Sequence, residues 1–212
     1  MGEDVEKKEE KMNNLAHLYL SGKSKDVMVG NFIADVIKGR QIEQYSGEVL
    51  YGIRLHRVID QFIDTHPIAA KSRARFYPVY HHYSGVVNDM VYDHLLAQNW
   101  HHYSDEPLWK YSIYCYAVLL SRWFSLPVAV RSFLPNVVLN RRLTEYAKIS
   151  GLMDSLKVMS RSTSLPDHSE KLEEILLSHY DEFKSEFHAF FGEMIAEVER
   201  FKASYQEASQ GL

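Results

Sequence analysis

The stretch SGEVLYGIRLHRVIDQFIDT, residues 46–65, decides the fold class. Its apolar residues recur three and four positions apart, which is the spacing of one face of an α-helix. Pro67 follows two positions later and favours a helix end before it. We therefore predict a long amphipathic helix here, with an apolar side made of Val49, Leu50, Ile53, Val58 or Ile59, and Phe62.

The rest of the chain follows the same period. Only six prolines and ten glycines interrupt 212 residues, and they fall between segments of helical spacing. We predict an all-α protein, a single-domain helical bundle. Gly39 is expected to cap a helix over residues 25–38, and Asp167 with Glu170 to open one long helix ending near residue 205. A short apolar entry precedes them at 14–20, and further helices are predicted at 68–76, 79–99, 108–124 (central and buried), 128–139 and 141–159.

Composition limits the class of protein. The 46% of hydrophobic residues suffices for a sizeable core, and the net charge of -4 argues against nucleic-acid binding. The single cysteine, Cys115, allows no intrachain disulfide and no cysteine-based zinc site, which favours a reducing compartment. No uncharged apolar run is long enough to span a membrane, so we expect a cytoplasmic protein. Residues 1–11 are nearly all charged and are expected to be a flexible extension of a domain over residues 12–212.

Acids and histidines recur on three apolar segments. His56 and Asp60 are four residues apart, so a helix places them on one face, and Asp89 and Asp93 repeat that spacing. Asp35 closes the apolar run GNFIAD, where an unpaired charge is costly and a metal ion or a base is an expected partner. Imidazole and carboxylate together suit manganese, magnesium, iron or zinc. Spacing alone leaves two interpretations equally open, a metal site or hydrogen-bonded histidines beside solvated acid pairs.

Four ordered motifs resemble one known family. They are MNNLAHL at residues 12–18, GNFIAD at 30–35, HRVID at 56–60 with Asp64 after it, and DMVYDHLL at 89–96. In order and spacing they resemble the bacterial acyl carrier protein phosphodiesterases. The resemblance runs from residue 12 to about residue 205 and is strongest before residue 100.

The resemblance implies a helical, HD-domain-like enzyme, a divergent relative of the metal-dependent phosphohydrolases. Such an enzyme uses a divalent cation, preferably Mn²⁺, with Mg²⁺ or Fe²⁺ as alternatives. It hydrolyses the phosphodiester between 4'-phosphopantetheine and the serine of holo acyl carrier protein, giving the apo protein. The adjacent His-Asp pair that names the HD group is absent, and its nearest equivalents are the reversed Asp93-His94 and the spaced His56 and Asp60.

Carried onto this chain, the motif positions imply Asp35, His56, Asp60 and Asp93 as metal ligands. The remaining motif residues take supporting roles. His17 and His94 are candidates for additional ligation or for proton transfer to the leaving serine oxygen, and Asp89 for orienting a ligand. Arg57 either contacts the phosphate or forms a structural ion pair, and Asn31 either bonds Asp35 or is a surface residue.

Charge is distributed unevenly along the chain. Residues 38–75 carry seven basic and four acidic side chains, whereas residues 164–212 carry four basic and eleven acidic ones. Because acyl carrier proteins are small and strongly acidic, a basic face is expected to dock them. The candidate docking residues are Lys38, Arg40, Arg54, Lys71, Arg73 and Arg75; for each one, a solvated helix surface is the alternative.

Two other functions fit the same residues. An HD-type phosphohydrolase acting on a nucleotide or another small phosphoester would use the same metal site. A non-enzymatic helical adaptor would bind an acidic protein without hydrolysis. The 14 tyrosines and 10 phenylalanines also allow an exposed apolar surface for a partner or a homodimer, and the oligomeric state stays open.

Overall fold

The structure, a computed structural model, describes residues 15–210. Every regular element in this range is an α-helix or a short 3₁₀-helix (η), which confirms the all-α prediction. No helix between residues 15 and 210 has both the length and the apolar character to cross a bilayer. The predicted extension, residues 1–11, lies outside the described residues.

In chain order the elements are α1 (Leu15–Leu20), α2 (Lys25–Ile33), η1 (Ala34–Val36), η2 (Gly39–Gln44), α3 (Gly47–Thr65), α4 (Pro67–Ala74), α5 (Tyr77–Tyr80), η3 (His81–Tyr83), α6 (Ser84–Gln98), η4 (Trp100–His102), α7 (Leu108–Ser121), η5 (Trp123–Ser125), α8 (Val128–Leu139), α9 (Arg142–Glu145), α10 (Ile149–Ser162), α11 (Ser169–Ser178) and α12 (Tyr180–Gln210).

The helices α2 and α3 pack against each other more extensively than any other pair. Two glycines make the approach possible, since the Cα atoms of Gly30 and Gly52 serve as the contact points. A Cβ atom on Gly30 would overlap the backbone carbonyl of Val49, and one on Gly52 would overlap the carbonyl of Val27. This close crossing brings the polar residues of α2 against those of α3.

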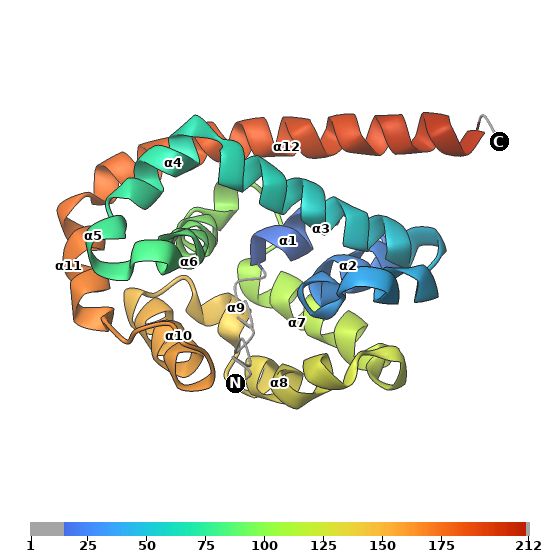
Figure 1. Cartoon of the computed structure of the whole chain (residues 1–212), viewed down its shortest axis with the longest axis horizontal. Coiled ribbons are helices and arrows are strands. Elements are labelled where there is room, and N and C mark those ends of the chain that lie inside the picture. The colour runs from blue at the N-terminus through green and yellow to red at the C-terminus, as the bar shows by residue number, and fades with distance from the viewer. Residues whose placement is uncertain (1–14, 211–212) are drawn as a thin grey trace, which may run out of the picture.

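The long helix α12 covers one side of the molecule (Figure 1). It runs antiparallel along α3, because Phe190 contacts Phe62 near the end of α3, and Phe201 stacks on Tyr51 near its start. Near the start of α12, the ring of Phe183 stacks on that of Phe76, which lies just after α4, with 5.1 Å between the centroids. The aromatic face of α12 therefore fixes α3 and α4 from one side.

The most deeply buried helix is α6, not the predicted central helix over 108–124. Twelve of the fifteen residues of α6 are buried, and α1, α4 and α10 pack around it. By contrast, α7 leaves Trp109, Ile113 and Leu120 between 44% and 59% exposed. The apolar composition of residues 108–124 predicted a helix correctly but not its burial.

Several helix boundaries differ from the predicted ones. The helix expected over 25–38 becomes a 3₁₀ turn after Ile33, and Gly39, with φ of +49°, starts η2 instead of capping α2. The helix expected over 79–99 is interrupted at His81, whose φ is +47°. The long helix expected after Asp167 is two helices that meet at His179, and the segment 141–159 also contains two, α9 and α10.

Candidate metal centre

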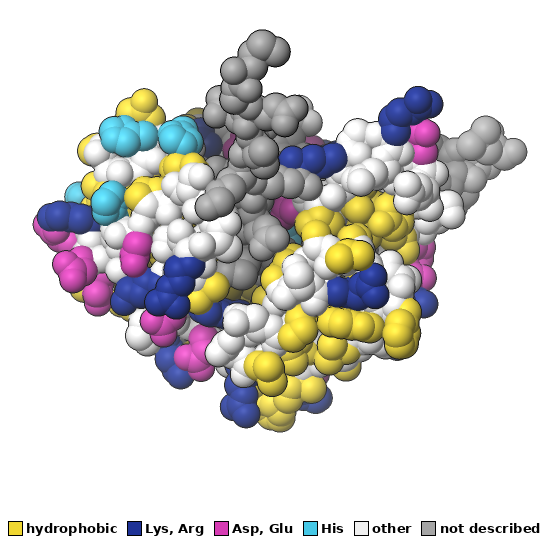
Figure 2. Space-filling view, turned by 60° about the horizontal axis from the view of Figure 1, so that its bottom comes forward, with side chains coloured by type: hydrophobic (Ala, Val, Ile, Leu, Met, Phe, Trp, Pro, Cys, Tyr) yellow, Lys and Arg dark blue, Asp and Glu magenta, His cyan; other side chains and the backbone are white. Residues whose placement is uncertain are grey.

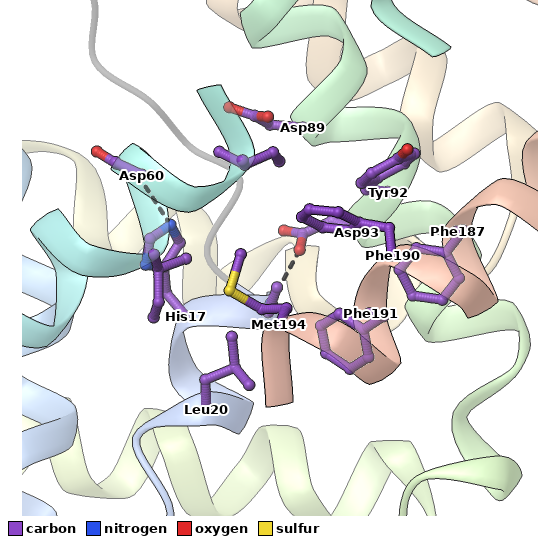
Figure 3. Close-up of a pocket in the computed structure, with 13 residues that line it drawn as sticks. His17, Leu20, Asp60, Asp89, Tyr92, Asp93, Phe187, Phe190, Phe191 and Met194 are labelled. Carbon is purple, nitrogen blue, oxygen red and sulfur yellow. Dashed lines mark hydrogen bonds and ion pairs between the residues drawn. The ribbon is translucent and has the colours of Figure 1, made fainter. Parts of the chain in front are cut away.

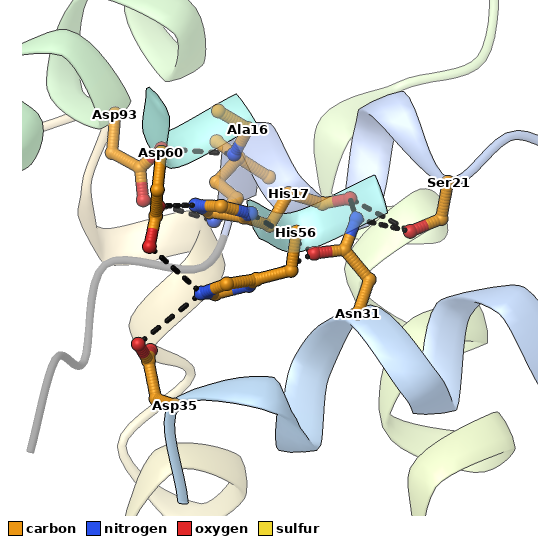
Figure 4. Close-up of polar contacts among 9 residues, drawn as sticks. Ala16, His17, Ser21, Asn31, Asp35, His56, Asp60 and Asp93 are labelled. Carbon is orange, nitrogen blue, oxygen red and sulfur yellow. Dashed lines mark hydrogen bonds and ion pairs between the residues drawn. The ribbon is translucent and has the colours of Figure 1, made fainter. Parts of the chain in front are cut away.

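Five polar side chains from α1, α2, η1 and α3 converge at one position (Figure 4). His17 lies on α1, Asn31 on α2, and His56 and Asp60 one turn apart on α3. Asp35 follows α2 in η1, whose tighter 3₁₀ geometry ends the α-helix just before this carboxylate. Sequence segments up to 43 residues apart thus supply one cluster.

Two carboxylates approach the outer edges of the imidazole rings. His56 Nε2 lies 3.2 Å from Asp35 Oδ1 and 3.2 Å from Asp60 Oδ2. His17 Nε2 lies 3.5 Å from the other oxygen of Asp60. The two rings stack with their centroids 4.1 Å apart. His17, His56 and Asp60 offer ligand atoms within 4.8 Å of one another, and no other such group occurs between residues 15 and 210.

The side chain of Asn31 orients both rings from the opposite side. Its Nδ2 donates to the carbonyl of His17 at 2.9 Å and to Ser21 Oγ at 3.0 Å, which fixes its Oδ1 toward the histidines. That oxygen lies 2.9 Å from His17 Nδ1 and 3.1 Å from His56 Nδ1. Because an amide oxygen only accepts, both Nδ1 atoms carry the hydrogen, and the Nε2 atoms point toward the carboxylates.

Burial and mutual contact set the charge states of the cluster. Burial lowers the pKa of His17, and the neighbouring His56 lowers it further. Burial would also lower the pKa of His56, but its hydrogen bonds to Asp35 and Asp60 prevail and raise the pKa to about 9. Burial would raise the pKa of Asp60, yet the hydrogen bonds from His17 and His56 hold it well below its usual range.

This donor set suits a divalent cation. A protonated His17 donates from Nε2 to Asp60, but burial lowers its pKa; once it is neutral, with its remaining hydrogen on Nδ1 and bonded to Asn31, the lone pair of Nε2 faces the carboxylate oxygen, so that two acceptors face each other. A cation between them removes the repulsion. Two ligands bound about 2.1 Å from one ion lie about 3.0–3.4 Å apart, close to the separations between His56 Nε2 and the two carboxylates. His17, His56 and Asp60, with Asp35 beside them, therefore fit a divalent metal ion.

A small cavity of about 30 Å³ adjoins the cluster (Figure 3). His17, Asp60 and Asp89 line it on one side, and Phe190 and Met194 are part of the apolar wall that α12 adds. The volume holds about one water molecule. The apolar wall excludes bulk water from this side and strengthens electrostatic interactions within the cluster.

Asp93, predicted as a ligand, has another set of partners. It is 2% exposed, and its two oxygens accept hydrogen bonds from the backbone N–H groups of Leu15 and Ala16, at 2.9 and 2.8 Å. These N–H groups begin α1 and have no partner within a helix. Burial raises the pKa of Asp93 to about 7, although both hydrogen bonds oppose the shift. The carboxylate thus ties α1, which carries His17, to α6.

The other predicted site residues are more scattered. His94 is fully buried, and its Nδ1 donates to the carbonyl of Tyr146, 2.7 Å away, on the side of α9 and α10. Arg57 is exposed on α3, and the half-buried Asp89 lines the cavity described above. The structure brings Asp35, His56, Asp60 and His17 together but places His94 in a different environment.

The six basic residues predicted to dock a partner divide into two groups. Lys71 and Arg75 both pair with Glu186 of α12, and Arg73 pairs with Asp64. These three cations are largely compensated within the protein. Of the other three, Arg40 pairs with Glu43 three residues on, and Lys38 and Arg54 are exposed.

Sequence reasoning left the role of Asn31 open, and the structure bonds it to both histidines and not to Asp35. Ser21, which supports the amide of Asn31, was not predicted at all. One signal was present but was not used: Asn31 lies between apolar residues from Val27 to Ile33, a setting typical of a buried position. Nothing in the spacing showed which side chains it would meet.

Comparisons with known proteins identify the family of this chain. The family model for acyl carrier protein phosphodiesterase matches residues 12–194. A protein of that name from Photorhabdus laumondii is 30% identical, with 89% of this chain and 96% of the relative covered. Those from Pectobacterium atrosepticum and Escherichia coli are 29% and 28% identical, with 87% and 89% of this chain and 96% and 98% of the relatives covered. No solved structure matches the chain. The chain belongs to the acyl carrier protein phosphodiesterase family, a family of hydrolases.

Proposed function

We propose that this protein is a cytoplasmic, metal-dependent phosphodiesterase that releases 4'-phosphopantetheine from holo acyl carrier protein and leaves the apo protein. The family supports the substrate, since its members are named for it. One observation supports the metal dependence most directly. The Nε2 atoms of His17 and His56 face the carboxylates while Asn31 occupies their Nδ1 atoms.

His17, His56 and Asp60 would hold the ion, with Asp35 as a further ligand. A divalent cation in such a site polarises a phosphoryl oxygen and lowers the pKa of a bound water. The family resemblance implies Mn²⁺, with Mg²⁺ or Fe²⁺ as alternatives, and a mixture of imidazole and carboxylate ligands is compatible with these ions. Asn31 keeps both rings in one tautomer, and the apolar wall of the cavity keeps the site partly dry.

The leaving serine oxygen needs a proton. Of the two histidines considered for this role, His17 lies in the cluster, whereas His94 is buried and bonded to the carbonyl of Tyr146. The position of His17 favours it over His94. In that role His17 would leave the ion to His56, Asp60 and Asp35, because its Nδ1 is bonded to Asn31 and its Nε2 cannot both bind the ion and carry the proton. Arg57 extends into solvent one residue after His56 and is free to contact the phosphate.

Holo acyl carrier protein incubated with the purified protein and Mn²⁺ tests the proposal. Mass spectrometry should show conversion to the apo protein and free 4'-phosphopantetheine, and the Asp60→Asn variant should show neither. Nucleotides and other small phosphodiesters assayed in parallel separate this substrate from the nucleotide alternative. Unchanged holo protein in the presence of bound metal would refute the substrate. A protein that binds the carrier but no metal would favour the adaptor.

A further inference from the structure

A large part of α7, η5 and α8 is apolar and open to solvent. The side chains of Phe124, Val128 and Leu139 are 94%, 73% and 81% exposed. Figure 2 shows hydrophobic side chains gathered over this region, at the lower right, with basic side chains among them. Contiguous exposed apolar surface usually marks a binding site. We call it the α7–α8 surface and define it by Trp109, Ile113, Leu120, Phe124, Val128 and Leu139.

The spacing of these residues places them in rows. Ile113 and Leu120 are seven residues apart, or about two turns, and therefore share one side of α7. Val128 and Leu139 are eleven residues apart, or about three turns, and share one side of α8. Each helix thus offers a partner two apolar side chains on one of its sides.

All charged side chains in this part of the sequence are basic. Between residues 107 and 144 the chain carries five basic residues and no acidic one. Arg122 pairs with Asp26 of α2, and Lys110 pairs with Glu106. Arg131 and Arg141 have no acidic partner among the residues that the structure describes. Uncompensated positive charge therefore lies within and beside the apolar rows, although the whole protein is negative.

This surface is attached to the helix that leads into the metal centre. The ring of Phe32 on α2 lies 6.0 Å from that of Phe133 on α8, and Phe32 precedes Asp35 by three residues. The pair formed by Arg122 and Asp26 ties the end of α7 to the start of α2. A partner on the α7–α8 surface would thus sit beside the element that carries Asp35.

We propose that the α7–α8 surface docks the acidic carrier protein, an inference that rests on the proposed function. An acidic protein with apolar side chains among its carboxylates complements both features of the surface. Of the basic residues first predicted to dock it, Lys38 and Arg54 are exposed without an acidic partner among the described residues, but η1, η2 and α3 carry none of the large hydrophobic side chains that are exposed. A symmetric contact between two copies would oppose like positive charges.

Two matched double variants test the inference. Phe124→Ser with Arg141→Glu alters the α7–α8 surface, while Leu177→Ser with Lys171→Glu makes the same changes on α11, at the opposite end of the molecule (Figure 1). Leu177 is 54% exposed and Lys171 is exposed, so both pairs remove one exposed apolar side chain and reverse one charge. The first variant should raise KM for holo carrier protein at least about tenfold, with kcat and Mn²⁺ affinity unchanged. The second should leave all three within about twofold.

Equal KM values for the two variants would overturn the inference. A fall in molar mass by light scattering without a change in KM would identify a self-association surface, and lost binding to anionic vesicles without a change in KM would identify a lipid-binding one. If the wild-type protein does not hydrolyse holo carrier protein, the proposed function fails by itself. The docking inference is then decided by titrating apo carrier protein into both variants: weaker binding to the first alone supports it, and equal or absent binding refutes it.

Discussion

The amide of Asn31 sets the orientation of both histidines in the candidate metal centre. Replacing it in Asn31→Ala leaves two imidazole Nδ1 atoms without their shared acceptor. We expect the affinity for Mn²⁺ to fall about 10–100-fold, the usual effect of removing a residue that hydrogen-bonds to a metal ligand. Isothermal titration calorimetry measures this, with Asn136→Ala, an exposed amide on α8, as the control. An unchanged affinity would show that the rings need no support from Asn31.

The charge state of His56 predicts how metal binding depends on pH. With a pKa raised to about 9, the metal-free His56 holds a proton at pH 7 that an ion must displace. Asp60, with its pKa lowered, is already deprotonated. Mn²⁺ affinity should therefore increase about tenfold per pH unit from pH 7 toward 9, with about one proton released per ion at pH 7. Isothermal titration calorimetry in two buffers of different ionisation enthalpy gives the number of protons released per ion. An affinity that does not change with pH would contradict a protonated His56 in the metal-free protein.

The spacing along α3 predicted part of this site from the sequence alone. His56 and Asp60, four residues apart, do share a face of that helix. His17 was harder to place, because α1 and α3 are distant in sequence and no periodicity relates them. The contact between His17 and Asp60 depends on how α1 docks, which is a property of tertiary packing.

The short helix α1 depends on a single carboxylate from α6. A helix of six residues is not stable alone, and Asp93 supplies acceptors for its first two N–H groups. Asp93→Ala should lower the free energy of unfolding by about 1–3 kcal/mol, because buried donors lose their partner. It should also weaken Mn²⁺ binding by displacing His17. Urea denaturation and metal titration test both effects.

Asp154→Ala is the matched control for this change, since Asp154 is an exposed carboxylate on α10. It should alter neither stability nor metal binding. If Asp93→Ala abolished metal binding while leaving stability unchanged, Asp93 would be a ligand, as the motif resemblance implied, and not a support for α1.

Helix existence followed from the sequence, whereas helix ends often did not. The apolar stripe continues from Leu176 to Phe183 in helical register, seven residues apart, so periodicity gives no sign of the bend at His179. The bend occurs because α11 packs on α10 whereas α12 packs on α3 and α4. Similarly, His81 adopts a left-handed φ that its sequence neighbours do not require. These features are consequences of packing between distant elements.

The crossing of α2 and α3 controls how far His56 and Asp60 on α3 lie from Asn31 on α2 and from Asp35 in η1. Gly30→Ala and Gly52→Ala would each push a Cβ into the backbone of the other helix. We expect each to lower the free energy of unfolding by about 3 kcal/mol, the upper end for overpacking, and to abolish tight Mn²⁺ binding. Gly85→Ala on α6 is the control, since its Cβ would meet only Arg73 Cδ at 3.8 Å. The free energy of unfolding of the Gly85→Ala variant should change by less than about 1 kcal/mol. Equal effects at Gly30 and Gly85 would refute the argument.

At the scale of the whole molecule, the metal centre joins three separate segments of the N-terminal part of the chain. One face of the cluster comes from α1 and α3, and the other from η1 at the end of α2. The aromatic face of α12 supports α3 from behind, but it does not reach Asp35. An ion bound to these residues would therefore stabilise the arrangement of α1, η1 and α3 relative to one another.

This arrangement predicts that metal binding stabilises the entire fold. An ion that binds only the native state at a concentration 100 times its Kd adds about 2.7 kcal/mol to the free energy of unfolding. For a chain of this size the Tm should rise by roughly 5–10 °C with Mn²⁺ and return to its original value with a chelator. His56→Gln, which keeps a polar side chain but removes the imidazole, should abolish the shift, whereas the exposed His101→Gln should retain it. Differential scanning calorimetry measures all three proteins. A shift that survives in His56→Gln would place the ion elsewhere. His56 contacts both Asp35 and Asp60, so its loss must weaken any site that these two carboxylates share.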